Sequence, residues 1–269
     1  GRGLDVSPPS APASAPPLRR PRAILLDLDD TLINTGEAAE AAWRDVAARF
    51  AGELDCTPDR LHATIRDVSE RYWSDASRTP NDRLHAHTSR VAVTRLVVDA
   101  LVPAHPRRDR LAHAMAEHYG PRRLAGLSLY DDTLDTLAAL RRRGLPLALL
   151  SNGDAALQRG KVDRFGLAPW FRTVLIEGEI GYGKPTRRLY ERALDACGVI
   201  AMDAWCVGDH LEWEVAAPQR LGITGVWIDR SRHGLPLGSD TQPDVIVSSL
   251  NELTMRIDAL ATPRNRAAT

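Results

Sequence analysis

Short uninterrupted runs of apolar residues recur along the chain, and several of them end directly at charged or other polar residues. A run of this kind, without a polar residue at every second position, is typical of a strand that is buried on both faces of a parallel sheet. We therefore predict strands at residues 22–28, 145–150, 173–176, 204–207, 224–228 and 245–247.

Segments with the apolar spacing of helices separate these strands from residue 131 onward. We predict helices at residues 131–143, 155–165, 187–197 and 250–260, and a further helix between Asp209 and Leu221. This alternation predicts the α/β fold class, with a doubly wound, Rossmann-like parallel sheet. Ligands of such sheets bind beyond the carboxyl ends of the strands.

The segment 34–128 is different, because its pattern is helical throughout. We predict helices from about residue 35 to Gly52, then at 59–75, 88–102 and 107–119, the last ended by Gly120 and Pro121. This stretch is too long for a simple crossover between two strands. It therefore predicts an inserted all-α helical cap, with hinges near residues 33–36 and 126–130.

The predicted domain organisation follows from these patterns. Residues 1–21 are rich in Pro, Ala and Ser and predict a disordered lead-in. The α/β core is expected at 22–33 and 129–262, with the helical cap at 34–128 between its two parts. Residues 263–269 form the expected C-terminal tail.

Composition narrows the classes of partner. The 269 residues include 35 basic and 35 acidic side chains, so the formal net charge of zero argues against a nucleic acid polymer or a membrane surface as partner. No apolar run approaches the ~20 residues that span a bilayer. The three cysteines lie far apart and form no C-x-x-C pair, which predicts neither a disulfide framework nor a zinc site and favours a cytoplasmic location.

Polar side chains gather at the predicted strand ends or just beyond them. Asp27 and Asp29 lie two residues apart, so their carboxylates can point the same way if the strand conformation persists. Like charges ~4 Å apart repel by ~4 kcal/mol at an effective dielectric constant of 20, which predicts a nearby cation or proton. Helix N-capping is the alternative, since Asp is favoured there. The other polar groups at these positions are Ser151 with Asn152, Lys184, and Asp209 with Glu214.

These residue types together suit phosphoryl transfer. A carboxylate can attack phosphorus and form an acyl-phosphate, while a second carboxyl group protonates the leaving alkoxide and later takes a proton from water. A hydroxyl group and backbone N–H groups can hold phosphate oxygens. An ammonium group can offset the charge of the nucleophile and the phosphate, and a further carboxylate can complete an oxygen-rich Mg²⁺ site.

In these motifs the sequence resembles the phosphatases of the haloacid dehalogenase (HAD) superfamily. The resemblance covers residues 22 to about 253, places the family's helical C1-type cap in the insertion, and is greatest to the branch of acylneuraminate-9-phosphatases and pyrimidine nucleotidases. The four motifs of the family stand here as Asp27-Leu28-Asp29-Asp30-Thr31, Ser151-Asn152, Lys184-Pro185, and Gly208-Asp209 followed by Glu214.

The resemblance implies a role for each motif residue. Asp27 is the implied nucleophile and Asp29 the implied general acid and base. Ser151 and Asn152 bind the transferring phosphoryl group, and Lys184 stabilises both the nucleophile and the phosphoryl oxygens. Dehalogenases of the family lack an aspartate at the position of Asp29, so its presence points to phosphoryl rather than carbon–halogen chemistry.

The resemblance also implies a Mg²⁺ site. Its ligands are the Asp27 carboxylate, the Asp29 backbone carbonyl and Asp209. Glu214 stands where the family usually has Asp, and we expect it to bind Mg²⁺ or its waters, although differently because Glu is one methylene longer. Thr31 is expected to shape the turn after the first strand, and His210 to contact substrate or support the site.

These observations predict a Mg²⁺-dependent phosphomonoesterase that acts through an aspartyl-phosphate on a small phosphorylated metabolite, such as a sugar phosphate or a nucleoside monophosphate. Two alternatives stay open. One is a sugar phosphomutase of the same fold, and the other is a catalytically silent module that binds phosphorylated ligands or a protein partner. A monomer or a homodimer is expected.

Several further residues are expected to have only structural roles. Lys161 is interpreted as a solvated helix residue. The basic pairs at 107–108 and 122–123 are interpreted as solvated helix faces rather than an anion site. The larger aromatic side chains of the insertion are interpreted as cap core: Trp43, Tyr72 and Trp73.

Overall fold

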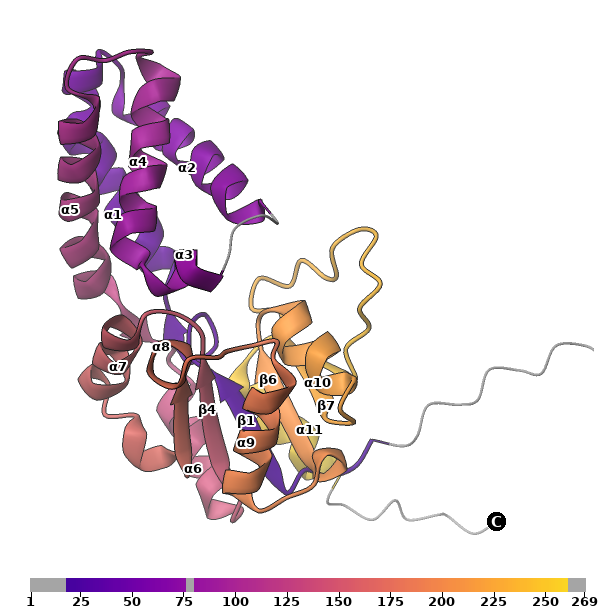
Figure 1. Cartoon of the computed structure of the whole chain (residues 1–269). Coiled ribbons are helices and arrows are strands. Elements are labelled where there is room, and N and C mark those ends of the chain that lie inside the picture. The colour runs from indigo at the N-terminus through magenta and orange to yellow at the C-terminus, as the bar shows by residue number, and fades with distance from the viewer. Residues whose placement is uncertain (1–17, 76–79, 261–269) are drawn as a thin grey trace, which may run out of the picture.

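The computed structural model describes residues 18–75 and 80–260 of the chain (Figure 1). The predicted lead-in up to residue 17 and the predicted tail at 263–269 lie outside these residues. Within the described ranges, no helix combines the length and the apolar character that crossing a membrane requires.

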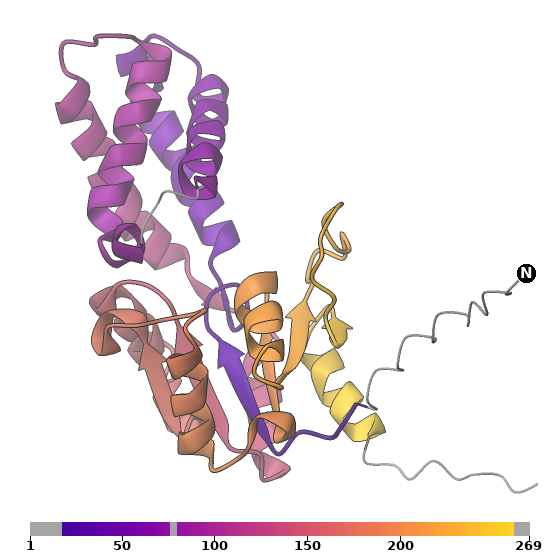
Figure 2. The same ribbon diagram turned by 45° about the vertical axis from the view of Figure 1, so that its right-hand side comes forward.

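The core is one parallel sheet of six strands in the order β5-β4-β1-β6-β7-β8. This arrangement, with helices on both faces, confirms the predicted α/β class and the doubly wound sheet (Figures 1 and 2). The strands are β1 (Ala23–Asp27), β4 (Leu147–Ser151), β5 (Thr173–Ile176), β6 (Ala204–Gly208), β7 (Thr224–Ile228) and β8 (Val245–Val247).

Strand β1 lies near the centre of the sheet, and its side chains alternate between two apolar layers. Ile24 and Leu26 pack against helices α6, α7 and α11, whereas Leu25 packs against α9 and α10. Burial on both faces explains why the strand carries an unbroken apolar run. The core helices are α6 (Thr133–Arg142), α7 (Ala155–Arg164), α8 (Glu177–Ile180), α9 (Arg187–Cys197), α10 (Ala217–Gln219) and α11 (Leu250–Ala259), with short helical turns η2 (Ala168–Trp170) and η3 (Ala201–Asp203).

The helical insertion forms a separate bundle above the carboxyl end of β1 (Figures 1 and 2). Its buried side chains make a hydrophobic cluster of their own. The two chain segments that join it to the core pair with each other as the antiparallel strands β2 (Ile33–Asn34) and β3 (Ser128–Leu129), where the hinges were predicted. The bundle contains α1 (Gly36–Phe50), η1 (Ala51–Leu54), α2 (Pro58–Ser74), α3 (Pro80–Leu84), α4 (Ala86–Leu101) and α5 (Arg108–Gly126).

Asp30, which follows the two predicted catalytic acids, binds the backbone at the start of the helical insertion. This residue has a left-handed backbone conformation, with φ of 56°. Its carboxylate accepts hydrogen bonds from the backbone N–H groups of Thr35 and Gly36, each at 2.9 Å, and from the Thr35 hydroxyl at 2.7 Å. These contacts satisfy donors at the start of α1 and fix the angle at which the insertion leaves the core.

The predicted end of the last cap helix is wrong. Helix α5 continues through Gly120 and Pro121 to Gly126. The guanidinium group of Arg164, on core helix α7, donates hydrogen bonds to the carbonyl oxygens of Leu124, Ala125 and Leu127. Because these bonds satisfy carbonyls that a helix end leaves free, the core stabilises a last turn that local signals oppose.

Two further segments differ from the prediction in local structure. The residues between the predicted strand at 173–176 and the predicted helix at 187–197 begin with the short helix α8. The helix expected after Asp209 starts as a wider π-helical turn, η4 (Leu211–Ala216), before α10. Such wide turns occur frequently at functional sites, and η4 carries Glu214 into the core.

Candidate active site

Three adjacent strands deliver the predicted residues to one edge of the sheet. Strand β1 ends at Asp27, β4 ends at Ser151, and β6 ends at Gly208, just before Asp209. In the register, Asp27 lies opposite Leu150, and Leu26 lies opposite Val207. Parallel strands thus place residues from three distant parts of the sequence side by side.

Lys184 lies between two buried carboxylates. Its ammonium group donates hydrogen bonds to Asp27 Oδ1 at 2.5 Å and to Glu214 Oε1 at 2.7 Å. The exposed fractions of Lys184, Asp27 and Glu214 are only 2%, 7% and 1%. A buried charge of this kind is tolerated because it is paired and hydrogen-bonded on both sides.

Burial and charge shift the pKa values in this group. Burial raises the pKa of Asp27, and it raises the pKa of Glu214 to about 7. The pKa of Lys184 is raised as well, because its two carboxylate partners outweigh the effect of burial. Lys184 is therefore held as a cation beside the predicted nucleophile.

The backbone of Gly208 passes close to the two carboxylates that hold the Lys184 ammonium group. A Cβ atom at Gly208 would lie 2.3 Å from Glu214 Cγ and 2.9 Å from Asp27 Cβ, so no larger residue fits between the two carboxylates. The side chain of Asn152 fixes the main chain of Lys184: its Oδ1 accepts from the Lys184 N–H at 2.7 Å, and its Nδ2 donates to the Lys184 carbonyl at 2.8 Å. Asn152, predicted to bind phosphate, thus also positions the lysine.

Asp29 has its own cationic partner, which corrects the interpretation of Lys161. The ammonium group of Lys161 contacts both Asp29 carboxylate oxygens, at 2.7 and 2.8 Å, and the residue is only 6% exposed. Gln158 Nε2 lies 2.9 Å from Asp29 Oδ2 and 2.6 Å from the Ser151 hydroxyl oxygen. Lys161 lowers the pKa of Asp29 against the opposing effect of burial.

Gln158 and Lys161 were missed because each looks ordinary in the sequence. The signal that could have found them is their spacing: residues three apart share one face of a helix. Asp154 caps α7, accepting a hydrogen bond from the Leu157 N–H at 2.9 Å, and α7 begins just after the end of β4. A helix that starts at this edge necessarily presents one face to the site.

Comparisons with known proteins show the family of the chain. A family model for haloacid dehalogenase-like hydrolases matches residues 21–222. The chain belongs to this hydrolase family. Phosphoserine phosphatase of Thermus thermophilus is 35% identical over 248 residues, which cover 86% of this chain and 97% of that protein. N-acylneuraminate-9-phosphatase of Rattus norvegicus is 27% identical, with 90% and 96% of the two chains covered.

A solved structure supports the fold. The HAD hydrolase YfnB of Bacillus subtilis, bound to magnesium, has a TM-score of 0.67 and 19% identity, over 89% of this chain and all of that one. The family model and the sequence relatives confirm the predicted family and branch, and with them the prediction of an enzyme of the HAD phosphatase type.

The oxygen groups of this HAD phosphatase fit a divalent cation. Among the described residues, no three His, Cys, Asp or Glu side chains are grouped to hold a metal. Mg²⁺, however, commonly uses one or two carboxylates and keeps several waters. Burial, with the negative charges of Asp27, Glu214 and Asp30, raises the pKa of Asp209 to about 8, so negative charge here is not fully compensated. A cation between Asp27 and Asp209 would relieve that repulsion.

Glu214 is less suited to be a metal ligand than the sequence suggested. One carboxylate oxygen accepts from Lys184, and the other accepts from the His210 N–H at 3.0 Å. His210 itself stacks on Trp213, with ring centroids 4.1 Å apart. Thr31 is fully buried, and its hydroxyl oxygen has no hydrogen-bond partner among the described residues.

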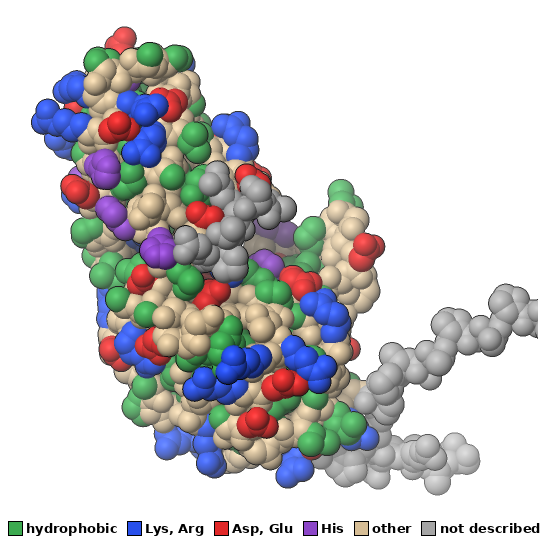
Figure 3. Space-filling view, in the orientation of Figure 1, with side chains coloured by type: hydrophobic (Ala, Val, Ile, Leu, Met, Phe, Trp, Pro, Cys, Tyr) green, Lys and Arg blue, Asp and Glu red, His purple; other side chains and the backbone are tan. Residues whose placement is uncertain are grey.

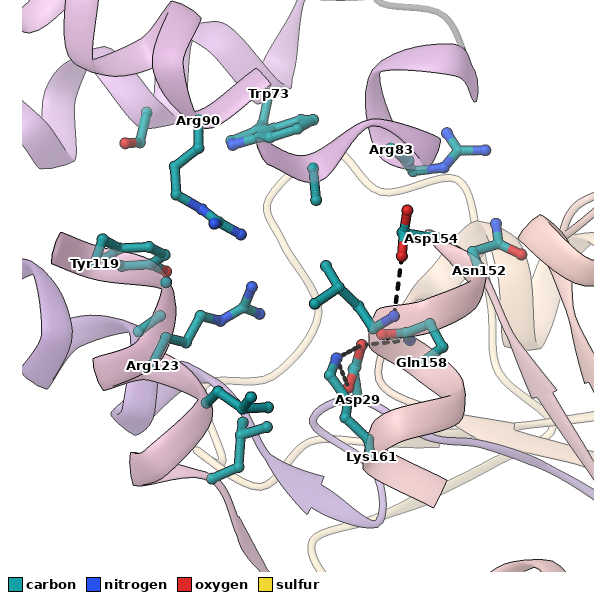
Figure 4. Close-up of a pocket in the computed structure, with 18 of the residues that line it drawn as sticks. Asp29, Trp73, Arg83, Arg90, Tyr119, Arg123, Asn152, Asp154, Gln158 and Lys161 are labelled. Carbon is teal, nitrogen blue, oxygen red and sulfur yellow. Dashed lines mark hydrogen bonds and ion pairs between the residues drawn. The ribbon is translucent and has the colours of Figure 1, made fainter. Parts of the chain in front are cut away.

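A cavity of about 670 Å³ lies between the insertion and the core (Figure 4). Asp29, Gln158 and Lys161 form part of its wall on the core side. Asp209 lines a neighbouring hollow instead. Arg83 of α3 crosses to the core, where its guanidinium group lies 3.1 Å from Glu177 Oε1.

The aromatic interpretation holds in part. Tyr72 is buried in the hydrophobic cluster of the insertion, and Trp43 packs against the same cluster while stacking on Tyr119 at a centroid distance of 3.8 Å. Trp43 also reaches the cavity, and Trp73 lines it with an exposed fraction of 49%. Basic and acidic side chains are interspersed on the face shown in Figure 3, in keeping with the zero net charge.

Proposed function

We propose that the chain is a Mg²⁺-dependent phosphomonoesterase that acts through an aspartyl-phosphate at Asp27. The observation that carries this proposal is the contact of Asp27 with the buried cation of Lys184, with a second aspartate, Asp29, two residues further on. A simple phosphate-binding site needs a cation, but it needs neither a nucleophile nor an acid.

Each residue then has a defined task. A carboxylate oxygen of Asp27 attacks phosphorus, the bond from phosphorus to the ester oxygen breaks, and Asp29 gives its proton to the leaving alkoxide. In the second half, Asp29 takes a proton from the water that attacks the aspartyl-phosphate, which releases inorganic phosphate and restores Asp27. Lys184 offsets the negative charge of nucleophile and phosphate in both halves.

The remaining residues hold these groups in place. Glu214 and Asn152 fix the ammonium and the main chain of Lys184. The Ser151 hydroxyl, at the end of β4, would bind a phosphoryl oxygen. Asp27, Asp209 and the Asp29 carbonyl would hold Mg²⁺, which supplies positive charge that lets an anionic nucleophile approach an anionic substrate.

The substrate class is a small phosphorylated metabolite. The relatives' names specify phosphoserine, glyceraldehyde 3-phosphate and N-acylneuraminate 9-phosphate, all of them small. A cavity of about 670 Å³ suits molecules of that size. We further propose that residues 34–128 act as a cap over the core, that the protein is a monomer or homodimer, and that it works in the cytoplasm, where its three free thiols would stay reduced.

The test is release of inorganic phosphate from a panel of sugar phosphates, nucleotides and phosphorylated amino acids, with Mg²⁺ and with a chelator. We expect release only with the metal, and a base-labile phosphate on the peptide that contains Asp27 after rapid acid quenching. Isomerised phosphosugars without free phosphate would replace the proposal by a mutase. Binding without either reaction would indicate the silent module.

Lys161 should set the pH range in which Asp29 works as an acid. Lys161→Met removes the charge that lowers the pKa of Asp29, so that pKa should rise. Because protonated Asp29 is needed in the first half-reaction, the alkaline limb of the kcat/KM profile should move to higher pH by roughly one unit or more. Lys161→Arg, which keeps the charge, should move it less. Superimposable profiles of Lys161→Met and wild type would contradict this role.

A further inference from the structure

Two arginines of the insertion lie in the wall of the cavity beyond the catalytic groups. Arg90 is on α4, and Arg123 is on α5. Figure 4 shows both guanidinium groups projecting into the same space, with Asp29 and Lys161 on the core side of the cavity. The interpretation of residues 122–123 as a solvated face is therefore wrong for Arg123.

Neither arginine forms an ion pair with an acidic residue in the part of the chain that the structure describes. Burial, Tyr119 and Arg123 are the influences on the charge of Arg90, with no carboxylate among them, and the buried Nε atom of Arg123 has no hydrogen-bond partner among the described residues. Arg83, in the same cavity wall, differs because it forms an ion pair with Glu177. Among the described residues, Arg90 and Arg123 are thus the arginines of this wall that no carboxylate neutralises through an ion pair.

The surrounding helices are shaped to hold these side chains. The guanidinium group of Arg90 lies over the ring of Tyr119, 5.0 Å from its centroid, which restricts its position. A Cβ atom at Gly120 would lie 3.2 Å from Arg90 Nη1, so a residue without a side chain leaves space for the guanidinium against α5. The glycine that we expected to end the helix instead makes room for an arginine.

The two guanidinium groups repel each other, and the charge of Arg123 also acts on catalytic residues across the cavity. Burial and the charge of Arg123 lower the pKa of Arg90, which means that the two cations repel. Arg123 also contributes to lowering the pKa values of Asp29 and Lys161, so its charge is felt across the cavity. An anion between the arginines would remove a repulsion that the protein alone leaves uncompensated.

We propose that Arg90 and Arg123 bind a second anionic group of the substrate, a carboxylate or a second phosphate, while the scissile phosphate lies at Asp27. This inference rests on the proposed function and names its substrate class: a small phosphate ester that carries another anion at its far end. Guanidinium groups suit both anions, because their planar forks donate paired hydrogen bonds to two oxygens.

The test uses pairs of substrates that differ mainly in the second anion. O-phosphoserine is compared with O-phosphoethanolamine for the carboxylate, and fructose 1,6-bisphosphate with fructose 6-phosphate for the second phosphate. In at least one pair, we expect the wild-type kcat/KM to be tenfold or more higher for the substrate that carries a second anionic group. That substrate is called the doubly anionic member of its pair. Whichever pair shows the preference identifies the anion.

Variants assign that preference to the two arginines. Arg90→Met and Arg123→Met should each lower the kcat/KM ratio of the preferred pair by about tenfold, mainly through a higher KM for the doubly anionic member. Arg123→Lys should retain part of the ratio, since it keeps a charge but loses the fork. Arg110→Met is the matched control, because Arg110 is an exposed arginine on the same helix, and it should leave the ratio at the wild-type value.

A binding experiment separates failure of this inference from failure of the proposed function. The same pairs are titrated calorimetrically into Asp27→Asn and into Asp27→Asn carrying Arg123→Met. Tighter binding of the doubly anionic member, lost in the double variant, supports the inference even if no substrate is turned over. Hydrolysis with equal kcat/KM and equal affinity within both pairs, unchanged in the arginine variants, overturns the inference and leaves the phosphatase proposal standing.

Discussion

Asp27→Asn is expected to lower phosphate release by about 10⁴- to 10⁶-fold, the loss that follows removal of the nucleophile in a covalent mechanism. The amide has nearly the shape of the carboxylate but lacks the charged oxygen that attacks phosphorus. Phosphate release at saturating substrate and Mg²⁺ measures the effect. The acid-quenched peptide that contains residue 27 should carry no phosphate in the variant.

The fold should survive this change. Lys184 keeps its contact with Glu214, and Asn can still accept a hydrogen bond from the ammonium through its amide oxygen. Cooperative unfolding, followed by circular dichroism, checks this point. Asp67→Asn, at an exposed acid on α2, is the matched control and should keep full activity. Turnover of Asp27→Asn within tenfold of wild type would exclude a covalent role for Asp27.

The core of this site could be predicted because its signals are local. Asp27 and Asp29 stand at the end of an apolar run, and Ser151 ends another such run. A strand buried on both faces, followed at once by polar groups, is readable within ten residues of sequence. Topology does the rest, since every parallel strand ends at the same edge of the sheet.

The family resemblance assigned Lys184 to Asp27, but no local pattern showed which residues would pair with Asp29. Lys161 and Asp29 are 132 positions apart, and Lys184 and Asp27 are 157 apart. Helical periodicity shows that a residue lies on a given face, but it does not show what that face contacts. Only the strand order, with β1 between β4 and β6, turns α7 toward Asp29.

The residues of the cavity wall could not be predicted from the sequence for a related reason. Arg90 and Arg123 belong to different helices of the insertion, and their convergence depends on how α4 packs against α5. Gly120 was read by its local preference as a helix end, whereas a distant arginine, Arg164, extends the helix beyond it. Tertiary contacts of this kind override local propensity.

Lys184→Met should have two separable effects. Loss of the ammonium removes the charge that offsets nucleophile and phosphate, and phosphate release should fall on the order of 10³-fold. The change also leaves Asp27 and Glu214 buried without their shared cation. Breaking one side of a buried ion pair typically lowers the free energy of unfolding by about 3–5 kcal/mol.

The free energy of unfolding of Lys184→Met should fall as pH rises. Acids whose pKa is lowered in the folded state have the opposite effect, because they lose stability as pH falls. Without Lys184, burial holds the folded-state pKa values of Asp27 and Glu214 above their unfolded values near 4. Stability is then fullest at low pH, where both are protonated, and is lost as pH rises through the folded-state values. Denaturant unfolding with a chelator should show the variant closer to wild type at pH 5 than at pH 8.

A second variant separates the catalytic from the structural consequence. Lys184→Met combined with Glu214→Gln removes one of the two uncompensated carboxylates, so it should recover part of the lost stability at pH 8 without recovering activity. Lys184→Arg keeps a charge, but its larger planar group does not fit a position that is 2% exposed, and it should also be poorly active.

If Lys184→Met were equally destabilised at pH 5 and pH 8, the two carboxylates would not be what the lysine compensates. If the double variant regained activity with its stability, Lys184 would have a structural role only, and the stabilisation of phosphoryl transfer would have to come from elsewhere in the site.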